Sequence, residues 1–62
     1  MAADLPPIGT WVRINSGDFG KIDMTATAMA MVRVRIDHSH SPGSWYGVWV
    51  TADEIEEVLN DG

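Results

Sequence analysis

A regular alternation of aliphatic and charged side chains in residues 31–37 (MVRVRID) constrains the fold more than any other feature of this sequence. Val32, Val34 and Ile36 are separated from one another by arginines. Successive side chains of an extended chain point to opposite faces, so a period of two gathers the aliphatic residues on one face. The segment therefore predicts a β-strand that is buried on one side.

Three other segments also predict strands. Residues 10–15 and 21–28 alternate in the same way, and residues 45–50 are rich in the aromatic and β-branched side chains that favour strands. In residues 45–50 both alternating sets are apolar, so the sequence leaves open which set faces inward. The two candidate sets are Tyr46, Val48 and Val50, and Trp45, Gly47 and Trp49.

Residues 51–59 predict a short helical turn that leads into a final strand. Thr51 is followed three residues later by Glu54, the spacing of a capping box at the start of a helix. The chain is thus expected to be all-β: a small barrel of four to five antiparallel strands with one short helical turn before the last strand. Residues 8–59 would form the barrel, residues 1–7 a flexible N-terminal tail and residues 60–62 a C-terminal tail.

Size and composition limit how such a barrel can be stabilised. A chain of 62 residues forms one domain with a thin core, and without cysteine it has no disulfide or thiolate zinc site. Stability must come from a compact sheet, large aromatic side chains or self-association. No apolar run is long enough to span a bilayer and the start lacks the pattern of a signal peptide, so a soluble, cytoplasmic protein without a membrane partner is expected. The net charge of −5 argues against duplex DNA as a partner.

Three stretches of the chain resemble the SH3-like small barrels: IGTWVRINSGDFGKI, VRVRID and ADEIEEV. The first of them also resembles the KOW element of ribosomal and transcription-elongation proteins. The resemblance implies that the four to five strands form a small SH3-like barrel. Its KOW-like part implies a module that binds RNA or the transcription or translation machinery.

Two further resemblances are looser. The stretch HSPGSWYGVWVTADEIEEV is similar to the end of the plasmid-type (type II) dihydrofolate reductases, which are SH3-like tetramers with a shared active pore. That similarity implies an oligomeric pore enzyme. In the reductases a Val-Gln-Ile-Tyr stretch follows a similar turn, whereas residues 45–48 of this chain are Trp-Tyr-Gly-Val, so no catalytic residue carries over. The SH3-like peripheral subunit of photosystem I has a similar succession of the stretches VRI, VRVRID and EIEEV.

The pair His38 and His40 has the spacing that places two imidazoles on one side of an extended segment. A metal site needs a third or fourth ligand, and the nearest candidate is Asp37. Because serines and a Pro-Gly turn surround the histidines, we interpret the segment as a solvated polar loop and predict no metal site.

The aromatic residues are the strongest candidates for function. Trp and Tyr dominate the hot spots of protein interfaces, and an exposed apolar cluster usually marks an interaction site. Two arginines in residues 31–37 point to one face and can flank such a cluster. The predicted partner-binding residues are Trp11, Arg33, Arg35, Trp45, Tyr46 and Trp49.

The sequence therefore predicts a non-catalytic adaptor or regulatory module that docks another protein, or a second copy of itself, without catalytic residues or a cofactor. The first alternative is a KOW-like module that binds RNA. The second alternative is an oligomeric pore enzyme of the dihydrofolate reductase kind.

Overall fold

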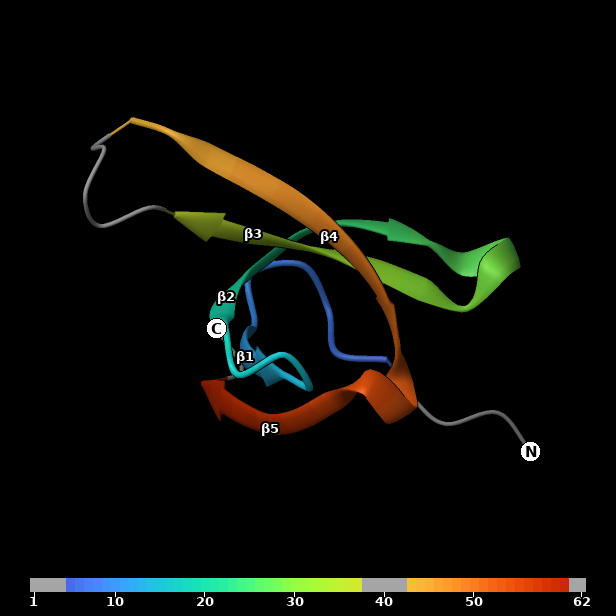
Figure 1. The fold of residues 1–62 in the computed structure, drawn as a ribbon. Helices are drawn as coiled ribbons and strands as arrows, with labels where there is room; N and C mark the ends of the chain where they lie inside the picture. Colours follow the sequence, from blue (N-terminus) through green and yellow to red (C-terminus); the bar gives the residue numbers. More distant parts are fainter. Residues whose placement is uncertain (1–4, 38–42, 61–62) are drawn as a thin grey trace.

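The computed structural model describes residues 5–37 and 43–60, and these form one five-stranded antiparallel sheet in the strand order β4-β3-β2-β1-β5 (Figure 1). The predicted all-β fold of a small barrel type is confirmed. The single helical turn before the last strand is confirmed as well, as the 3-10 turn η2. The elements are β1 (Trp11–Ile14), β2 (Phe19–Ala26), η1 (Thr27–Met29), β3 (Met31–Asp37), β4 (Trp45–Thr51), η2 (Ala52–Glu54) and β5 (Ile55–Asn60).

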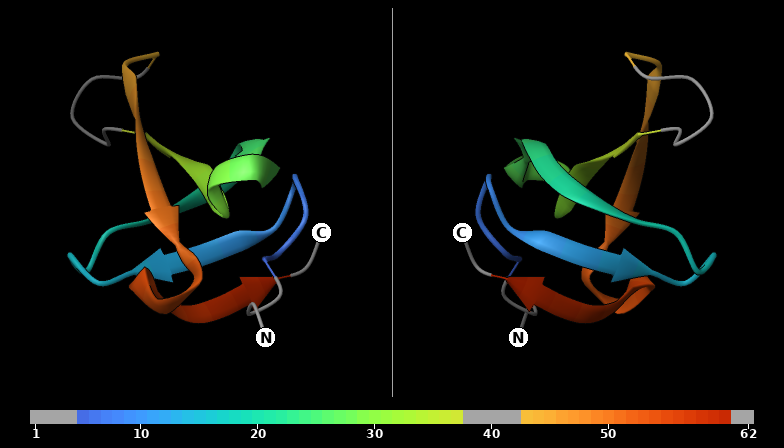
Figure 2. Two further views of the ribbon diagram at one scale, coloured as in Figure 1. Left: turned by 90° about the vertical axis from the view of Figure 1, so that its right-hand side faces the viewer. Right: turned by 90° about the vertical axis from the view of Figure 1, so that its left-hand side faces the viewer.

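The sheet coils on itself, so that β1 and β5 run across the direction of β4 (Figure 2). Gly20 in β2 makes this curvature possible, because a Cβ atom on it would stand 2.1 Å from the carbonyl oxygen of Arg35 in β3. Only glycine allows two backbones to approach so closely. A register shift between Ile22 and Met24 then bends β2 further. Because of this shift, no residue of β3 lies opposite Asp23 in the strand pairing.

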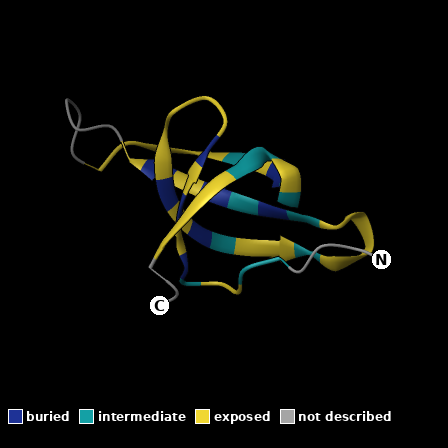
Figure 3. Cartoon of the chain, turned by 90° about the horizontal axis from the view of Figure 1, so that it is seen from below, coloured by how far each residue is buried: buried dark blue, intermediate teal, exposed yellow. Residues whose placement is uncertain are grey.

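The core inside the coil is aliphatic. Val34 pairs with Ile22 on one side and with Val48 on the other, and the chain also packs Leu5 and Ile55 against this interior. The predicted inward face of residues 31–37 is confirmed. The buried apolar side chains are Val12, Ile14, Ile22, Val32, Val34, Ile36 and Val50, and Figure 3 shows where the buried positions lie along the chain.

All five aromatic rings of the chain lie outside this core. Even the least exposed of them, Trp11 and Tyr46, keep 37% of their surface in contact with solvent. Aromatic side chains normally supply much of the buried area of a small domain. Their position here indicates that the rings serve the surface of the barrel.

The strand predicted over residues 21–28 is displaced by two residues, because β2 begins at Phe19 and ends at Ala26. After Ala26, η1 reverses the chain toward β3 with Ala30 in the left-handed region at φ 53°. The alternation of alanine and threonine continues through the turn, but small side chains give little preference between strand and turn.

The two histidines at positions 38 and 40 lie outside the described residues. No helix among the described residues has the length and apolar character needed to cross a membrane.

Candidate interaction surface

The register between β3 and β4 decides which side of β4 faces outward. Val34 lies opposite Val48, and Arg33 lies opposite Trp49. Residues directly opposite in an antiparallel pair share a face of the sheet. Because Val34 is buried, Val48 belongs to the inner face, and Trp49 belongs to the outer face with Arg33. Of the two orientations that the sequence leaves open, the structure has the tryptophans outside.

Arg33 lies at the centre of this outer face. Its side chain crosses Gly47, so that a Cβ atom on the glycine would stand 2.6 Å from Cδ of the arginine. Its guanidinium carbon lies 5.4 Å from the centre of the Trp45 ring, within cation–π range. On its other side the guanidinium donates two hydrogen bonds to the carboxylate of Asp23, from Nε to Oδ1 at 2.8 Å and from Nη2 to Oδ2 at 2.9 Å.

This two-point contact changes the titration of both groups. The hydrogen bond from Arg33 lowers the pKa of the Asp23 carboxyl, and burial opposes it only in part. The same hydrogen bond raises the pKa of Arg33. Each side chain has about a quarter of its surface exposed, so the pair is half-buried and its geometry is fixed from two strands. Asp23 can reach the arginine because the bulge in β2 turns it toward β3.

Arg35 supports the same tryptophan from the next outward position of β3. Its guanidinium carbon is 4.8 Å from the centre of the Trp45 ring, and its Nε lies 3.4 Å from Oδ1 of Asp37. The ring of Trp45 therefore contacts two cations whose charges are both balanced by carboxylates. We refer to Trp45, Trp49, Arg33 and Arg35 as the tryptophan face.

An apolar hollow of about 410 Å³ lies at one end of the tryptophan face. It is lined by Ala26, Met29, Met31 and Trp49. Met29 in η1 is the most exposed large apolar residue among the described residues, at 69%. Unbranched methionine side chains adapt to the shape of a partner, so this hollow extends the apolar contact area beyond the rings.

Tyr46 points to the opposite face of β4. It pairs with Ile36 of the core strand, and its hydroxyl donates a hydrogen bond of 3.3 Å to Oδ2 of Asp18 in the turn between β1 and β2. Desolvation is the main cause that raises the pKa of Tyr46, and the charge and hydrogen bond of Asp18 act in the same direction. The hydrogen bond of Tyr46 thus connects the start of β4 to that turn.

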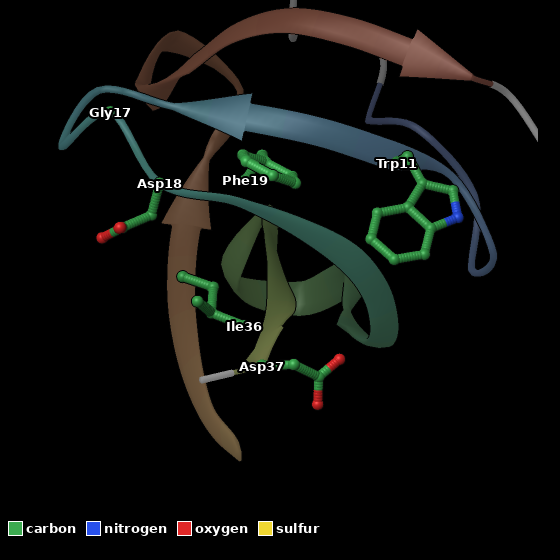
Figure 4. Close-up of a pocket in the computed structure, with 6 residues that line it drawn as sticks. All are labelled: Trp11, Gly17, Asp18, Phe19, Ile36 and Asp37. Carbon is green, nitrogen blue, oxygen red and sulfur yellow. The ribbon is translucent and has the colours of Figure 1, made fainter. Parts of the chain in front are cut away.

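Trp11 lies on the outer face of β1, which is separated from the strand of Trp45 by two strands, β3 and β2. It pairs with Lys21 and borders a hollow of about 340 Å³ together with Phe19 and Asp37 (Figure 4). The remaining lining residues of this hollow are Gly17, Asp18 and Ile36.

Of the six residues that the sequence predicts for partner binding, the structure gathers four on the tryptophan face and places Trp11 and Tyr46 elsewhere. The sequence prediction did not include Asp23, Gly47 or Met29. The alternation of β3 contains a signal for one of them: arginines on an outer face need acidic partners on a neighbouring strand, and Asp23 is the acidic residue of β2. No cluster of three or more metal-ligating side chains exists among the described residues.

No family model, no curated protein and no solved structure matches this chain.

Proposed function

We propose that this protein is a non-catalytic interaction module of the cytoplasm that docks another protein chain through the tryptophan face. The observation that carries the proposal is the exposure of Trp45 and Trp49, at 43% and 41%, on one side of one strand. Covering apolar surface is worth about 25 cal/mol per Å², and tryptophan is enriched among the residues that dominate binding energy.

The tryptophan face is already ordered before a partner arrives. Arg33 is held by two hydrogen bonds to Asp23 and lies across Gly47, and Trp45 lies against the guanidinium groups of Arg33 and Arg35. Side chains that are fixed in advance lose little conformational entropy on binding. This arrangement favours a face built for contact over a set of rings exposed by chance.

The charges favour a protein partner over RNA. Each of the three arginines forms an ion pair with a carboxylate: Arg13 with Glu57, Arg33 with Asp23, and Arg35 with Asp37. Binding to a nucleic-acid backbone needs cations that are available for phosphates. Within the described residues, Lys21 alone among the basic side chains has no ion pair, and one lysine in a chain of net charge −5 is a weak basis for RNA binding.

We also propose that the fold is an SH3-like barrel. This proposal is supported by the five antiparallel strands and by the short turn η2 between β4 and β5, which suit a small barrel. The dihydrofolate reductase resemblance stays a prediction, and NADPH turnover by the purified protein is its direct test.

The proposal is tested by selecting peptides from a random displayed library against the wild-type protein. Two-dimensional NMR spectra of the protein with each selected peptide then report where it binds. We expect the indole N–H signals of Trp45 and Trp49 to shift on titration, and Trp45→Ala or Trp49→Ala to weaken binding at least tenfold.

The matched control is Leu59→Ala, because Leu59 is 45% exposed on β5, at the other end of the sheet. This control should bind the peptides as the wild type does. Selected peptides that bind equally well to the tryptophan variants would refute the proposal. Binding of single-stranded RNA that weakens steeply with salt and is lost in Arg33→Ala would favour the RNA alternative instead.

A further inference from the structure

β4 is an edge strand of the sheet, and its free edge is a second binding element beside the tryptophan face. The strand order ends at β4, and no ladder joins it to β5 within the described residues. Figure 1 shows β4 as a long strand at the outside of the coil. Exposed edges of this kind can accept another strand through their main-chain groups.

Hydrogen bonds at the start of the sheet fix which main-chain groups face this free edge. Ile22 donates to the carbonyl of Thr10 at 2.9 Å, and its own carbonyl accepts from Gly9 at 2.8 Å. The main chain of Ile22 therefore points away from β3, and that of Lys21 points toward it, because directions alternate along a strand. Lys21 pairs with Arg35, whose main-chain groups consequently face β2.

The same alternation continues into β4. Val34 faces β4 and pairs with Val48, so Val48 uses its main-chain groups within the sheet. The main-chain groups of its neighbours Gly47 and Trp49 therefore point to the free edge. Those of Thr51 point the same way, and its N–H donates a hydrogen bond outside the sheet, to Oε1 of Glu54 at 2.8 Å. Trp45, Gly47 and Trp49 thus present both their side-chain face and their amides to a partner.

From this geometry we infer that the partner is a second copy of this chain, which pairs its β4 antiparallel with β4 about a two-fold axis at Gly47. This inference rests on the proposed function, because it names the partner of the same surface. A two-fold axis at Gly47 places Trp45 opposite Trp49 of the second copy, and Tyr46 opposite its Val48. The residues whose amides face the edge then form the hydrogen-bonded pairs.

The distribution of charge favours a second copy as the occupant. β4 contains no charged residue, and on the face beside it the two arginines are balanced by Asp23 and Asp37. Two molecules of net charge −5 can therefore meet along β4 without placing like charges opposite each other. The other edge strand differs, because Glu56 and Glu57 of β5 would repel their own copies there.

The contact area predicts a weak dimer. At roughly 200 Å² for a large aromatic side chain, the exposed parts of Trp45 and Trp49 amount to about 340 Å² over two copies. A stable interface buries about 1,200 Å² or more, so the rings supply only part of what a tight dimer needs. We therefore expect association that depends on concentration in the micromolar to millimolar range.

The experiment combines sedimentation equilibrium with NMR amide exchange on the full chain over that range. We expect the mass to rise from one chain toward two, and the exchange of the Trp45, Gly47 and Trp49 amides to slow as the dimer forms. The Val48 amide, bonded to β3 in both states, is the internal control. Trp49→Ala should weaken dimerisation at least tenfold, and Leu59→Ala should leave it unchanged.

Three results would overturn the inference, and they separate it from the proposed function. If the protein is a monomer at every concentration and its tryptophan face still binds selected peptides, the dimer is refuted and the proposed function stands. If a dimer forms but its edge amides exchange as fast as in the monomer, the pairing of β4 with β4 of the second copy is refuted. A dimer that Trp45→Ala and Trp49→Ala leave intact removes self-pairing at this face, and the peptide selection then decides the proposed function by itself.

Discussion

Arg33 and Asp23 form a half-buried, two-point ion pair that joins β3 to β2 on the side of β3 away from the exposed tryptophans of β4. The pair connects the stability of the barrel with the order of its candidate binding surface, because the same guanidinium contacts Trp45. Changes at Asp23 should therefore be visible both in unfolding and in the environment of that ring.

Asp23→Asn should lower the free energy of unfolding at neutral pH and make it less sensitive to acid. The folded state lowers the pKa of Asp23, so its ionised form stabilises the fold above the ordinary value of 3.8. That contribution is lost as the pH falls from this value through the lower folded one. Urea unfolding at neutral and acidic pH measures the difference. Asp37→Asn, which alters a more exposed pair, should have a smaller effect; equal effects would contradict the special role of Asp23.

Gly20→Ala should destabilise the protein by about 2 kcal/mol or more, because the new methyl group collides with backbone. The nearest atoms are the carbonyl oxygen and carbon of Arg35, at 2.1 and 2.9 Å, and a strand cannot move as freely as a side chain. Gly47→Ala is the comparison, since its methyl group would meet the side chain of Arg33, which can rotate away. Thermal and urea unfolding should rank the two variants in that order, and the reverse order would mean that β2 and β3 can separate at Gly20.

Val34→Asp should prevent folding, because it places an unpaired charge at the centre of a core of seven side chains. Circular dichroism and the dispersion of NMR signals report the outcome. Val58→Asp is the control, since Val58 is 51% exposed on β5. A folded Val34→Asp protein would show that the inner face of β3 is assigned wrongly.

Tyr46 should ionise only above the ordinary tyrosine range, and Asp18→Asn should lower its pKa toward that range. Burial contributes most to the rise and stays in the variant, so the recovery will be partial. Because the folded pKa is raised, the neutral phenol stabilises the fold below pH 10, and this contribution is lost as the pH climbs through the folded value. Absorbance of the phenolate during an alkaline titration measures the shift. An unchanged midpoint in Asp18→Asn would exclude the contact between the two side chains.

Alternation of residue types is sufficient to predict most of the fold. Val32, Val34 and Ile36 are buried as their spacing requires, and Thr51 with Glu54 marks the turn before the last strand. These features depend on neighbours in the sequence, so the chain itself contains the information.

The outward face of β4 could not be predicted in this way, because both of its alternating sets are apolar. Pairing with β3 decides the question: Val48 lies opposite the buried Val34, which leaves Trp49 opposite Arg33. Register between strands is a long-range property, and here the pairing of β3 with β4 runs without a shift from Met31 opposite Thr51 to Asp37 opposite Trp45. The tryptophan face therefore becomes visible only in three dimensions.

The exclusion of every aromatic ring from the core has a practical consequence for spectroscopy. Near-ultraviolet absorption and fluorescence of this protein arise from side chains at the surface, while the aliphatic interior gives no signal there. Intrinsic fluorescence should thus respond sensitively to ligands and to crowding between molecules. Unfolding will change the fluorescence only to the extent that the rings lose their contacts with neighbouring side chains. Emission spectra of this protein therefore report mainly on molecules that bind at its surface.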